Sequence, residues 1–304
     1  MTEHIEKSFD AVAESYRYRL SYHRLFFAEL SEKLTLTRES KILDMCCGNG
    51  QLSVGLADKV RKLVAIDNSS GMLSLAPQHP RIAYLNHDIN SALPPSLTNE
   101  QFDHFLVGRA IPFIRTDSLG DAVAKHLKAG GSIVICGTEW SSNTVWFGEF
   151  YKVLTSYGEG GERDFFGESK LAQIGFSLIN SLDIRYKADC DLNFLLNHAM
   201  SYSRRAKKIH TDIDNFKKQL ADRMRPFLRD GVLSGEASSW ALIYRSNMEI
   251  RSSLSPICRE SSRNVITGMR SIVERLSRWL QNPHRPDFFC TQSKCDRRFG
   301  RAMT

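Results

Sequence analysis

The sequence contains no apolar run of the roughly 20 residues that a membrane span requires. Its first 20 residues carry acids among their bases and no apolar stretch of signal-peptide type. With 42% hydrophobic and 25% charged residues, the 304-residue chain has the composition of an ordinary globular protein. We therefore expect a cytoplasmic protein without a membrane span.

Cysteines in a pattern suited to disulfides or zinc are also missing. The seven cysteines are an odd number, and the neighbours Cys46 and Cys47 are poorly placed for a structural disulfide, which favours reduced thiols. Cys290 and Cys295 lack a second pair of ligands nearby, so no metal site is predicted.

Excess positive charge is scarce in most of the chain, although the formal net charge of the whole is +7. Residues 247–304 hold 11 Lys or Arg against 5 Asp or Glu, which is +6 and leaves 7 − 6 = +1 for residues 1–246. We predict a domain over 1–246 and a basic C-terminal extension over 247–304, partly helical with a flexible end. Arg270, Arg275 and Arg278 fit a solvated surface, and the alternative is contact with an acidic partner, nucleic acid or a membrane surface.

Apolar segments that alternate with helix-forming stretches predict a doubly wound, mostly parallel α/β sheet. Ligands are expected at the carboxyl ends of its strands. The five strands expected in series are KILDM (41–45), LVAID (63–67), IAYLNHD (82–88), FDHFLVG (102–108) and SIVICG (132–137), and two later strands are expected within 171–186 and 239–245.

Helical spacing of apolar residues predicts a cap around this sheet. Phe9, Val12, Tyr16, Leu20, Phe27 and Leu30 indicate an opening amphipathic helix. Residues 1–40 and about 141–230 are assigned to the cap, with helices over 146–158, 191–206 and 214–228 and a loop over 158–167.

The turn that follows the first strand, ILDMCCGNGQ (42–51), is suited to a nucleotide-like ligand, because Gly48 and Gly50 let the backbone approach it closely. Asp44 just before the turn would repel a pyrophosphate but attract the ammonium group of an amino acid joined to a sulfonium nucleoside. Ser53 occupies the place of the third glycine of the dinucleotide pattern, and this also disfavours NAD.

Two further acids stand at the ends of the next strands. Asp67 could accept both ribose hydroxyls, and Asp88 could accept from an adenine amino group while Ile89 or Met72 packs on the ring. One acid at a strand end is commonly a solvated or capping residue. Three acids at successive strand ends favour a nucleoside site.

The ordered segments 42–57, 63–73, 86–89, 102–114 and 127–135 resemble the motifs of class I S-adenosylmethionine-dependent methyltransferases. Residues 9–30, the Trp-containing segment after the sheet strands, and the later GF and SYS are similar to the small-molecule branch that includes trans-aconitate methyltransferase. The resemblance covers about residues 8–245 and implies a Rossmann-like fold with S-adenosylmethionine as cofactor. It implies a cofactor pocket made of Asp44, Cys46, Cys47, Gly48, Gly50, Asp67, Asn68, Met72, Asp88, Ile89 and Gly108.

This sequence departs from the family pattern at two points. Cys46 replaces the usual first glycine, and Pro112 and Phe113 replace the His-Trp that often follows the fourth strand in this branch. The candidate catalytic residues are Tyr16 and Arg109, and the candidate substrate contacts are Tyr22, Trp140 and Tyr202. Each of the five could instead have a packing or surface role.

The favoured interpretation is a methyltransferase acting on an O, N or C nucleophile of a small molecule. The alternatives are a nucleic-acid methyltransferase that uses the basic extension, a cofactor-binding protein without transfer activity, and an NAD-dependent oxidoreductase. The segment GRAIPFI (108–114) lacks the Asn/Asp-Pro-Pro-aromatic arrangement of enzymes that methylate base amino groups, which makes a nucleic-acid substrate the weaker choice. The sequence does not indicate an oligomeric state.

Overall fold

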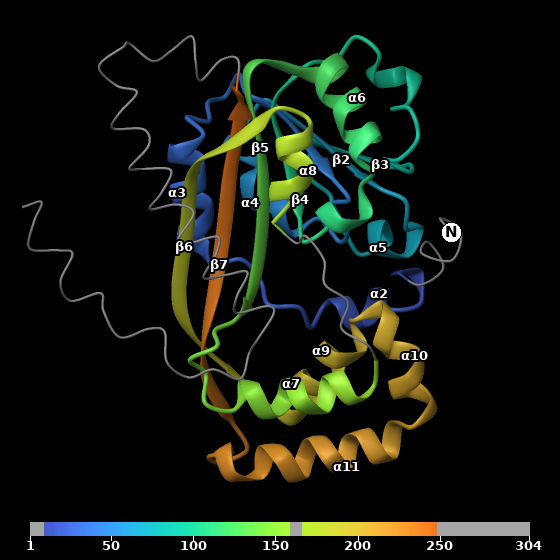
Figure 1. Cartoon of the computed structure of the whole chain (residues 1–304), viewed down its shortest axis with the longest axis vertical. Coiled ribbons are helices and arrows are strands. Elements are labelled where there is room, and N and C mark those ends of the chain that lie inside the picture. Colours follow the sequence, from blue (N-terminus) through green and yellow to red (C-terminus); the bar gives the residue numbers. More distant parts are fainter. Residues whose placement is uncertain (1–8, 159–165, 248–304) are drawn as a thin grey trace, which may run out of the picture.

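A seven-stranded sheet forms the centre of the protein. The computed structural model describes residues 9–158 and 166–247, and its strands lie in the order β3-β2-β1-β4-β5-β7-β6 (Figure 1). β7 alone runs opposite to the other six strands, and it pairs antiparallel with β5 and β6, so the predicted mostly parallel α/β class is confirmed. The strands span Lys41–Met45 (β1), Lys62–Asp67 (β2), Ile82–Asn86 (β3), Phe102–Gly108 (β4), Leu127–Trp140 (β5), Phe176–Cys190 (β6) and Leu233–Ser246 (β7).

The sheet has a switch point between β1 and β4. The chain builds β1, β2 and β3 outward and then returns to place β4 on the other side of β1. Met45 is in register with Val107, so the residues that follow β1 and β4 begin side by side. Ligands of open α/β sheets bind at such a point, outside the carboxyl ends of the strands.

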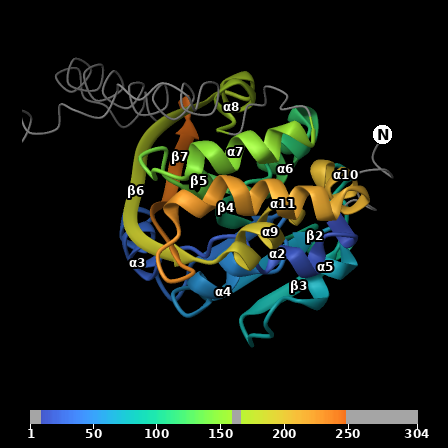
Figure 2. The ribbon, with the colours of Figure 1, turned by 90° about the horizontal axis from the view of Figure 1, so that it is seen from below.

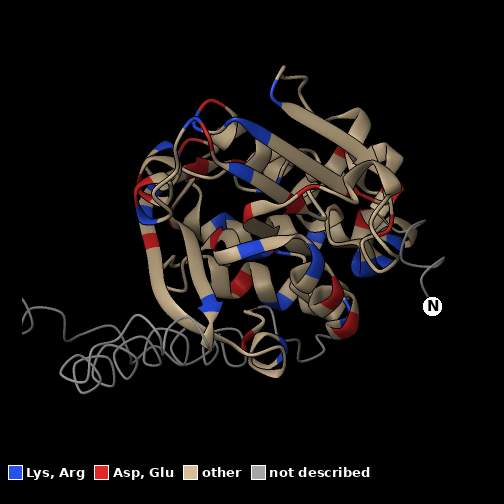
Figure 3. Ribbon diagram, turned by 90° about the horizontal axis from the view of Figure 1, so that it is seen from above, with Lys and Arg blue, Asp and Glu red and all other residues tan. Residues whose placement is uncertain are grey.

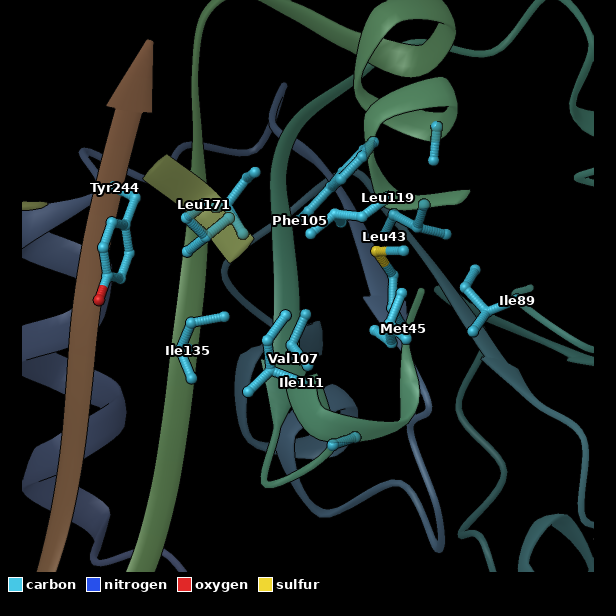
Figure 4. Close-up of a cluster of buried hydrophobic side chains, with 14 of the residues drawn as sticks. Leu43, Met45, Ile89, Phe105, Val107, Ile111, Leu119, Ile135, Leu171 and Tyr244 are labelled. Atoms are coloured by element: carbon cyan, nitrogen blue, oxygen red, sulfur yellow. The ribbon is translucent and has the colours of Figure 1, made fainter. Parts of the chain in front are cut away.

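Alternating strand side chains form a core on each face of the sheet. Leu43 and Met45 point into the cluster drawn in Figure 4, which includes Leu119 of α6 and Leu171 of α8. Ile42 points the other way, toward α3 and α4. The helices span Ala13–Tyr16 (α2), Arg24–Lys33 (α3), Gln51–Ala57 (α4), Ser70–Ser74 (α5), Thr116–His126 (α6), Phe147–Ser156 (α7), Glu168–Gln173 (α8), Leu192–Met200 (α9), Ser203–Thr211 (α10) and Ile213–Met224 (α11), with short 3-10 turns at Pro95–Leu97, Ile111–Phe113 and Arg225–Phe227.

Strands β5, β6 and β7 extend beyond the others and carry a helical cap. They contain 14, 15 and 14 residues, and their pairing continues to Trp140 opposite Ala237. The predicted strands 132–137 and 239–245 were therefore too short. Helices α7, α9, α10 and α11 lie below the sheet in Figure 1 and across the view in Figure 2, over an aromatic core that includes Trp140, Trp146 and Phe216.

The predicted opening helix is wrong over residues 17–23. The chain leaves the helical path after α2 and resumes it only at Arg24, the first residue of α3. The carbonyls of Tyr18, Leu20 and Ser21 accept hydrogen bonds from side chains of the sheet and cap. These distant donors replace the backbone donors that a continuous helix would supply. The predicted helix over 191–206 is likewise divided, at Ser201 and Tyr202, into α9 and α10.

The amino-terminal edge of the sheet carries paired charges. Lys41 and Lys62 both contact Glu100, at 2.8 and 2.7 Å, and Lys128 contacts Asp103 at 2.8 Å. Figure 3 views the molecule from this side and shows Lys and Arg interspersed with Asp and Glu. The basic extension beyond Asn247 and most of the predicted loop 158–167 lie outside the described residues. No helix in the described part of the chain is both long and apolar enough to cross a membrane.

Candidate functional site

The glycine turn after β1 bends tightly back toward β2. The Cys47 N–H donates to the Ile66 carbonyl at 2.9 Å, and the Gly50 N–H donates to the Cys47 carbonyl at 3.0 Å. Gly48 and Gly50 have left-handed φ angles of 56° and 76°, which glycine adopts without steric cost. A Cβ atom on Gly50 would lie 2.5 Å from the Tyr84 hydroxyl oxygen. The turn therefore needs glycine at position 50 for both its backbone angle and its space.

Asp67, at the end of β2, is fastened to this turn. Its Oδ2 accepts from the Gly48 N–H at 2.8 Å and its Oδ1 from the Ser69 N–H at 2.9 Å. Burial raises the pKa of Asp67 above its usual range, while these backbone donors oppose the rise. The half-buried carboxylate is thus fixed in orientation beside the turn.

Asp44, near the end of β1, is fully buried. Its Oδ2 accepts from the Ser53 hydroxyl at 2.6 Å, whereas its Oδ1 has no hydrogen-bond partner within the described chain. Burial raises the pKa of Asp44 to about 7, and the charge of Asp67 adds to the rise against the Ser53 hydrogen bond. A buried carboxylate oxygen without a partner is costly, so this atom is suited to a cationic or donor group of a ligand.

The charges of the three strand-end acids all act on one residue, Cys46. Burial first, and then the charges of Asp67, Asp44 and Asp88, raise the pKa of Cys46 well above its usual range. Asp88 is half-buried, and its Oδ1 accepts from the Asn90 N–H at 2.9 Å. The structure thus brings the predicted acids together around Cys46, which is half-buried with a left-handed φ of 57°.

The other predicted cofactor residues are spread around this centre. Ile89 belongs to the core beside β1, whereas Met72 belongs to a separate cluster with Val12 and Ala13 of the N-terminal segment. Cys47 packs on the opposite face of the sheet. Asn68 follows Asp67 and is half-buried, and Gly108 ends β4 with the Tyr22 hydroxyl 3.3 Å from where its Cβ would be.

Tyr16 and Tyr22 cover the site from the N-terminal segment. Both are half-buried, and Tyr16 lies 3.9 Å from where a Cβ of Gly48 would be. Burial raises the pKa of Tyr22 well above its usual range, and the nearby thiol of Cys136 adds to the rise. Tyr22 therefore stays a neutral phenol, packed on Phe26 with 4.9 Å between ring centroids.

Arg109, the predicted residue after β4, holds the loop 17–23. Its Nη2 donates to the carbonyls of Leu20 and Thr138, and the Thr138 hydroxyl donates to the Leu20 carbonyl at 2.7 Å. Its φ of 57° is in the left-handed region. This geometry gives Arg109 a positioning role for the loop.

The two predicted substrate contacts on the cap differ in exposure. Trp140 is only 1% exposed and packs edge-on against Trp146 with 4.7 Å between centroids, so its ring belongs to the cap core. Tyr202 is half-buried at the start of α10, with the Arg19 guanidinium carbon 3.8 Å from its ring centroid. Tyr202 therefore remains a candidate contact, whereas Trp140 acts through packing.

Three polar residues of this region carried no signal in the sequence. His198 of α9 is buried, its Nδ1 lies 2.9 Å from the Tyr18 carbonyl, and its Nε2 lies 3.4 Å from the Tyr202 hydroxyl. Burial lowers the pKa of His198 to about 3, and the charges of Arg19 and Arg109 also act in that direction. Glu139 accepts from the Trp240 indole at 2.7 Å, and burial raises its pKa. Arg19, His198 and Glu139 meet only through contacts between distant segments, so neither spacing nor a motif could have identified them.

Comparison with known proteins gives a family match over part of the chain and a likeness in fold. Residues 42–131 match the family model described as a methyltransferase domain. A candidate type II methyltransferase from Anaeromyxobacter dehalogenans superposes with a TM-score of 0.60 at 17% identity, covering 75% of this chain and 97% of that one. A methyltransferase from Thiobacillus denitrificans, solved with S-adenosyl-L-homocysteine, gives 0.42 at 13% identity, covering 79% and 98%.

At these identities the structural likeness shows the fold alone, which is the Rossmann-like methyltransferase fold. No curated protein sequence matches the chain. The family match supports S-adenosylmethionine-dependent methylation and indicates S-adenosylmethionine as the cofactor.

Proposed function

We propose that the protein transfers the methyl group of S-adenosylmethionine to an O, N or C nucleophile of a small molecule. One observation carries the proposal: Asp44 and Asp67 are hydrogen-bonded to Ser53 and Gly48 at the glycine turn beside the switch point of the sheet, and the charges of both, with that of Asp88, reach the thiol of Cys46 in that turn. Three negative groups favour a cationic nucleoside over a dinucleotide, whose pyrophosphate they would repel.

The unused bonding capacity of these acids fits the cofactor. The unpartnered Oδ1 of Asp44 suits the ammonium group of the amino acid moiety. Asp67 accepts from the N–H groups of Gly48 and Ser69, and the Asn68 N–H also interacts with it; because a carboxylate offers about four acceptor sites, at least one is left for a ribose hydroxyl. Asp88 uses one oxygen for Asn90, which leaves the other for the adenine amino group.

The rest of the site would position the acceptor and exclude water. Bound S-adenosylmethionine supplies a methyl group already activated by its sulfonium centre. Proximity and orientation can contribute on the order of 7 to 11 kcal/mol to such a reaction. Tyr16 and Tyr22 would shield the methyl group, and Arg109 would fix the loop 17–23, which carries Tyr22 and follows Tyr16. A general base is needed only for an acceptor that arrives protonated.

Calorimetry with S-adenosylhomocysteine and NAD, side by side, tests the proposal. We expect the full chain to bind S-adenosylhomocysteine and to lose about tenfold or more of its affinity in Asp67→Ala, because a charge-assisted hydrogen bond is lost. Asp58→Ala removes an exposed carboxylate at the end of α4 and is the matched control. Tight binding of NAD with no response to S-adenosylhomocysteine would overturn the proposed function.

A further inference from the structure

We propose that Arg19 and Arg205 form the binding site for an anionic group of the methyl acceptor, a carboxylate or a phosphate. The inference rests on the proposed function, because it assigns a chemical class to the acceptor of that same site. Arg19 lies in the loop between α2 and α3, and Arg205 lies in the first half of α10.

Arg19 has an N–H donor without a partner among the described residues. Its Nη2 donates to the Ser201 carbonyl at 3.3 Å, and its guanidinium carbon lies 3.8 Å from the ring centroid of Tyr202. Its Nε is buried and has no acceptor among the described residues. A guanidinium carries five N–H donors in a planar fork that matches carboxylate and phosphate oxygens, so a donor set this incomplete is suited to an anion.

Arg205 repeats this pattern from the cap. Its Nε is also buried without a partner in the described chain, and its guanidinium carbon lies 5.7 Å from the same Tyr202 centroid. Its stem passes over the end of α7, where a Cβ on Gly158 would come within 3.0 Å of the Arg205 Cγ. Both guanidinium groups therefore lie near the same aromatic ring, and the hydroxyl of that ring lies 3.4 Å from His198 Nε2.

Among the described residues, no carboxylate lies within ion-pair distance of either guanidinium group. Neither Arg19 nor Arg205 forms an ion pair within residues 9–158 and 166–247, although Lys41 and Lys62 at the opposite edge share Glu100. The charge of Arg19 acts to lower the pKa of Glu139, but the two side chains form no ion pair, and Glu139 Oε1 accepts from the Trp240 indole instead. The pair is thus a positive site for which an anionic ligand group would supply the missing partner.

The site adjoins the residues assigned to the cofactor. The Arg19 guanidinium carbon lies 5.4 Å from the ring centroid of Tyr16, which in turn lies over Gly48. Ala206, next to Arg205, packs in the cluster that contains Met72. An acceptor whose anionic group is bound by the two arginines would therefore lie near the glycine turn.

Titration calorimetry on the full chain saturated with S-adenosylhomocysteine tests the inference. The probes are benzoate and phenyl phosphate as anions and benzamide as the neutral analogue. The variants are Arg19→Gln and Arg205→Gln. The matched controls are Arg17→Gln and Arg204→Gln, which remove the same charge from neighbouring positions: Arg17 pairs with Glu14 at 3.2 Å on the surface, and Arg204 is exposed on α10.

We expect an anionic probe to bind more tightly than benzamide and to lose about tenfold or more of its affinity in Arg19→Gln and Arg205→Gln but not in the controls. Preference for benzoate would indicate a carboxylic acid acceptor, and preference for phenyl phosphate a phosphorylated one. The inference is overturned if no anion binds better than benzamide, or if all four variants behave alike. Binding of S-adenosylhomocysteine is measured first on each protein, so its absence in the wild type identifies failure of the proposed function instead.

Discussion

The proposed cofactor side, at the glycine turn and its acids, and the proposed acceptor side, at the loop 17–23 and the cap, are held together in different ways. On the cofactor side, the decisive hydrogen bonds join residues close in sequence: Ser53 and Asp44 are 9 positions apart, and Gly48 and Asp67 are 19 apart. On the acceptor side, the loop 17–23 is fastened by bonds that span 118 positions to Thr138 and 180 positions to His198. The first arrangement follows from one βαβ unit, whereas the second requires the whole fold.

The two sides also bury opposite kinds of titratable group. Burial raises the pKa of Asp44 to about 7 and lowers the pKa of His198 to about 3. Each group is thereby driven toward its neutral form, as expected for low-dielectric surroundings. Their contributions to the free energy of unfolding therefore change with pH in opposite directions, and in the wild type the two changes partly cancel.

The largest expected effect is that of Asp44→Asn. Asp44 loses its proton near pH 3.8 in the unfolded chain but only near pH 7 in the folded protein. The stability that this group contributes therefore falls as the pH rises between these two values. One pKa unit corresponds to about 1.4 kcal/mol. We expect Asp44→Asn to be more stable than the wild type at pH 8 by up to about 4 kcal/mol, with the difference vanishing near pH 4. Urea unfolding as a function of pH measures it.

The same substitution should damage binding. Because an ammonium group prefers the ionised carboxylate, we expect the affinity of the wild type for S-adenosylhomocysteine to rise as the pH passes 7, and Asp44→Asn to bind weakly at every pH. Asp58→Ala, with its exposed carboxylate, should leave both profiles unchanged. An Asp44→Asn protein that binds as tightly as the wild type would remove Asp44 from the cofactor site.

A somewhat smaller effect, of opposite sign, is expected for His198→Gln. In the unfolded chain His198 is protonated as the pH falls through about 6.5, whereas in the folded protein it is protonated only near pH 3. The stability that His198 contributes is therefore lost as the pH falls below 6.5. Between pH 6.5 and 4 the loss amounts to about 3 kcal/mol. Glutamine can replace the hydrogen bonds to Tyr18 and Tyr202 without titrating. We expect His198→Gln to lose less stability than the wild type on acidification, and His210→Gln, on the exposed face of α10, to match the wild type.

These differences explain which parts of the molecule were predictable. The strands of the parallel half, the glycine turn and the acids at the carboxyl ends of β1, β2 and β3 were predicted from the sequence because each depends on a short, periodic segment. The family match over residues 42–131 covers much of the same region. The fold class follows from that half alone.

The acceptor side was not predictable in the same way. The helical spacing of Tyr16, Leu20 and Phe27 indicated a continuous helix. Side chains of His198, Arg109 and Thr138 instead hydrogen-bond to the carbonyls of Tyr18 and Leu20, in place of the backbone N–H groups of a helix. The paired arginines Arg19 and Arg205 are 186 positions apart in the chain (205 − 19) and become neighbours only when α10 packs beside the N-terminal segment. No local pattern encodes such a contact.

A moderate effect is expected for Gly50→Ala on the cofactor side. A left-handed alanine costs about 1 to 2 kcal/mol, and the contact of its Cβ at 2.5 Å from the Tyr84 hydroxyl adds about 1 kcal/mol or more of overpacking. Gly231→Ala is the matched control, because Gly231 has a similar φ of 80° and no described atom within 4 Å of the added Cβ. The difference between the two variants in urea unfolding isolates the contact with Tyr84. Equal losses in both would mean that only the backbone angle matters at Gly50.

The smallest expected effect, Cys46→Gly, separates backbone strain from ligand contact. Cys46 has a left-handed φ of 57°, so glycine should relieve about 1 to 2 kcal/mol of strain but cost about 0.5 to 1 kcal/mol in unfolded-state entropy, a net gain of about 0.5 kcal/mol. Asp230→Gly, at an exposed φ of 50°, should gain a similar amount. Only Cys46→Gly should change the affinity for S-adenosylhomocysteine, because only Cys46 stands among the three acids. If calorimetry finds the two variants alike in affinity, the Cys46 side chain does not face the cofactor, and the departure from the family pattern at this position is one of backbone strain alone.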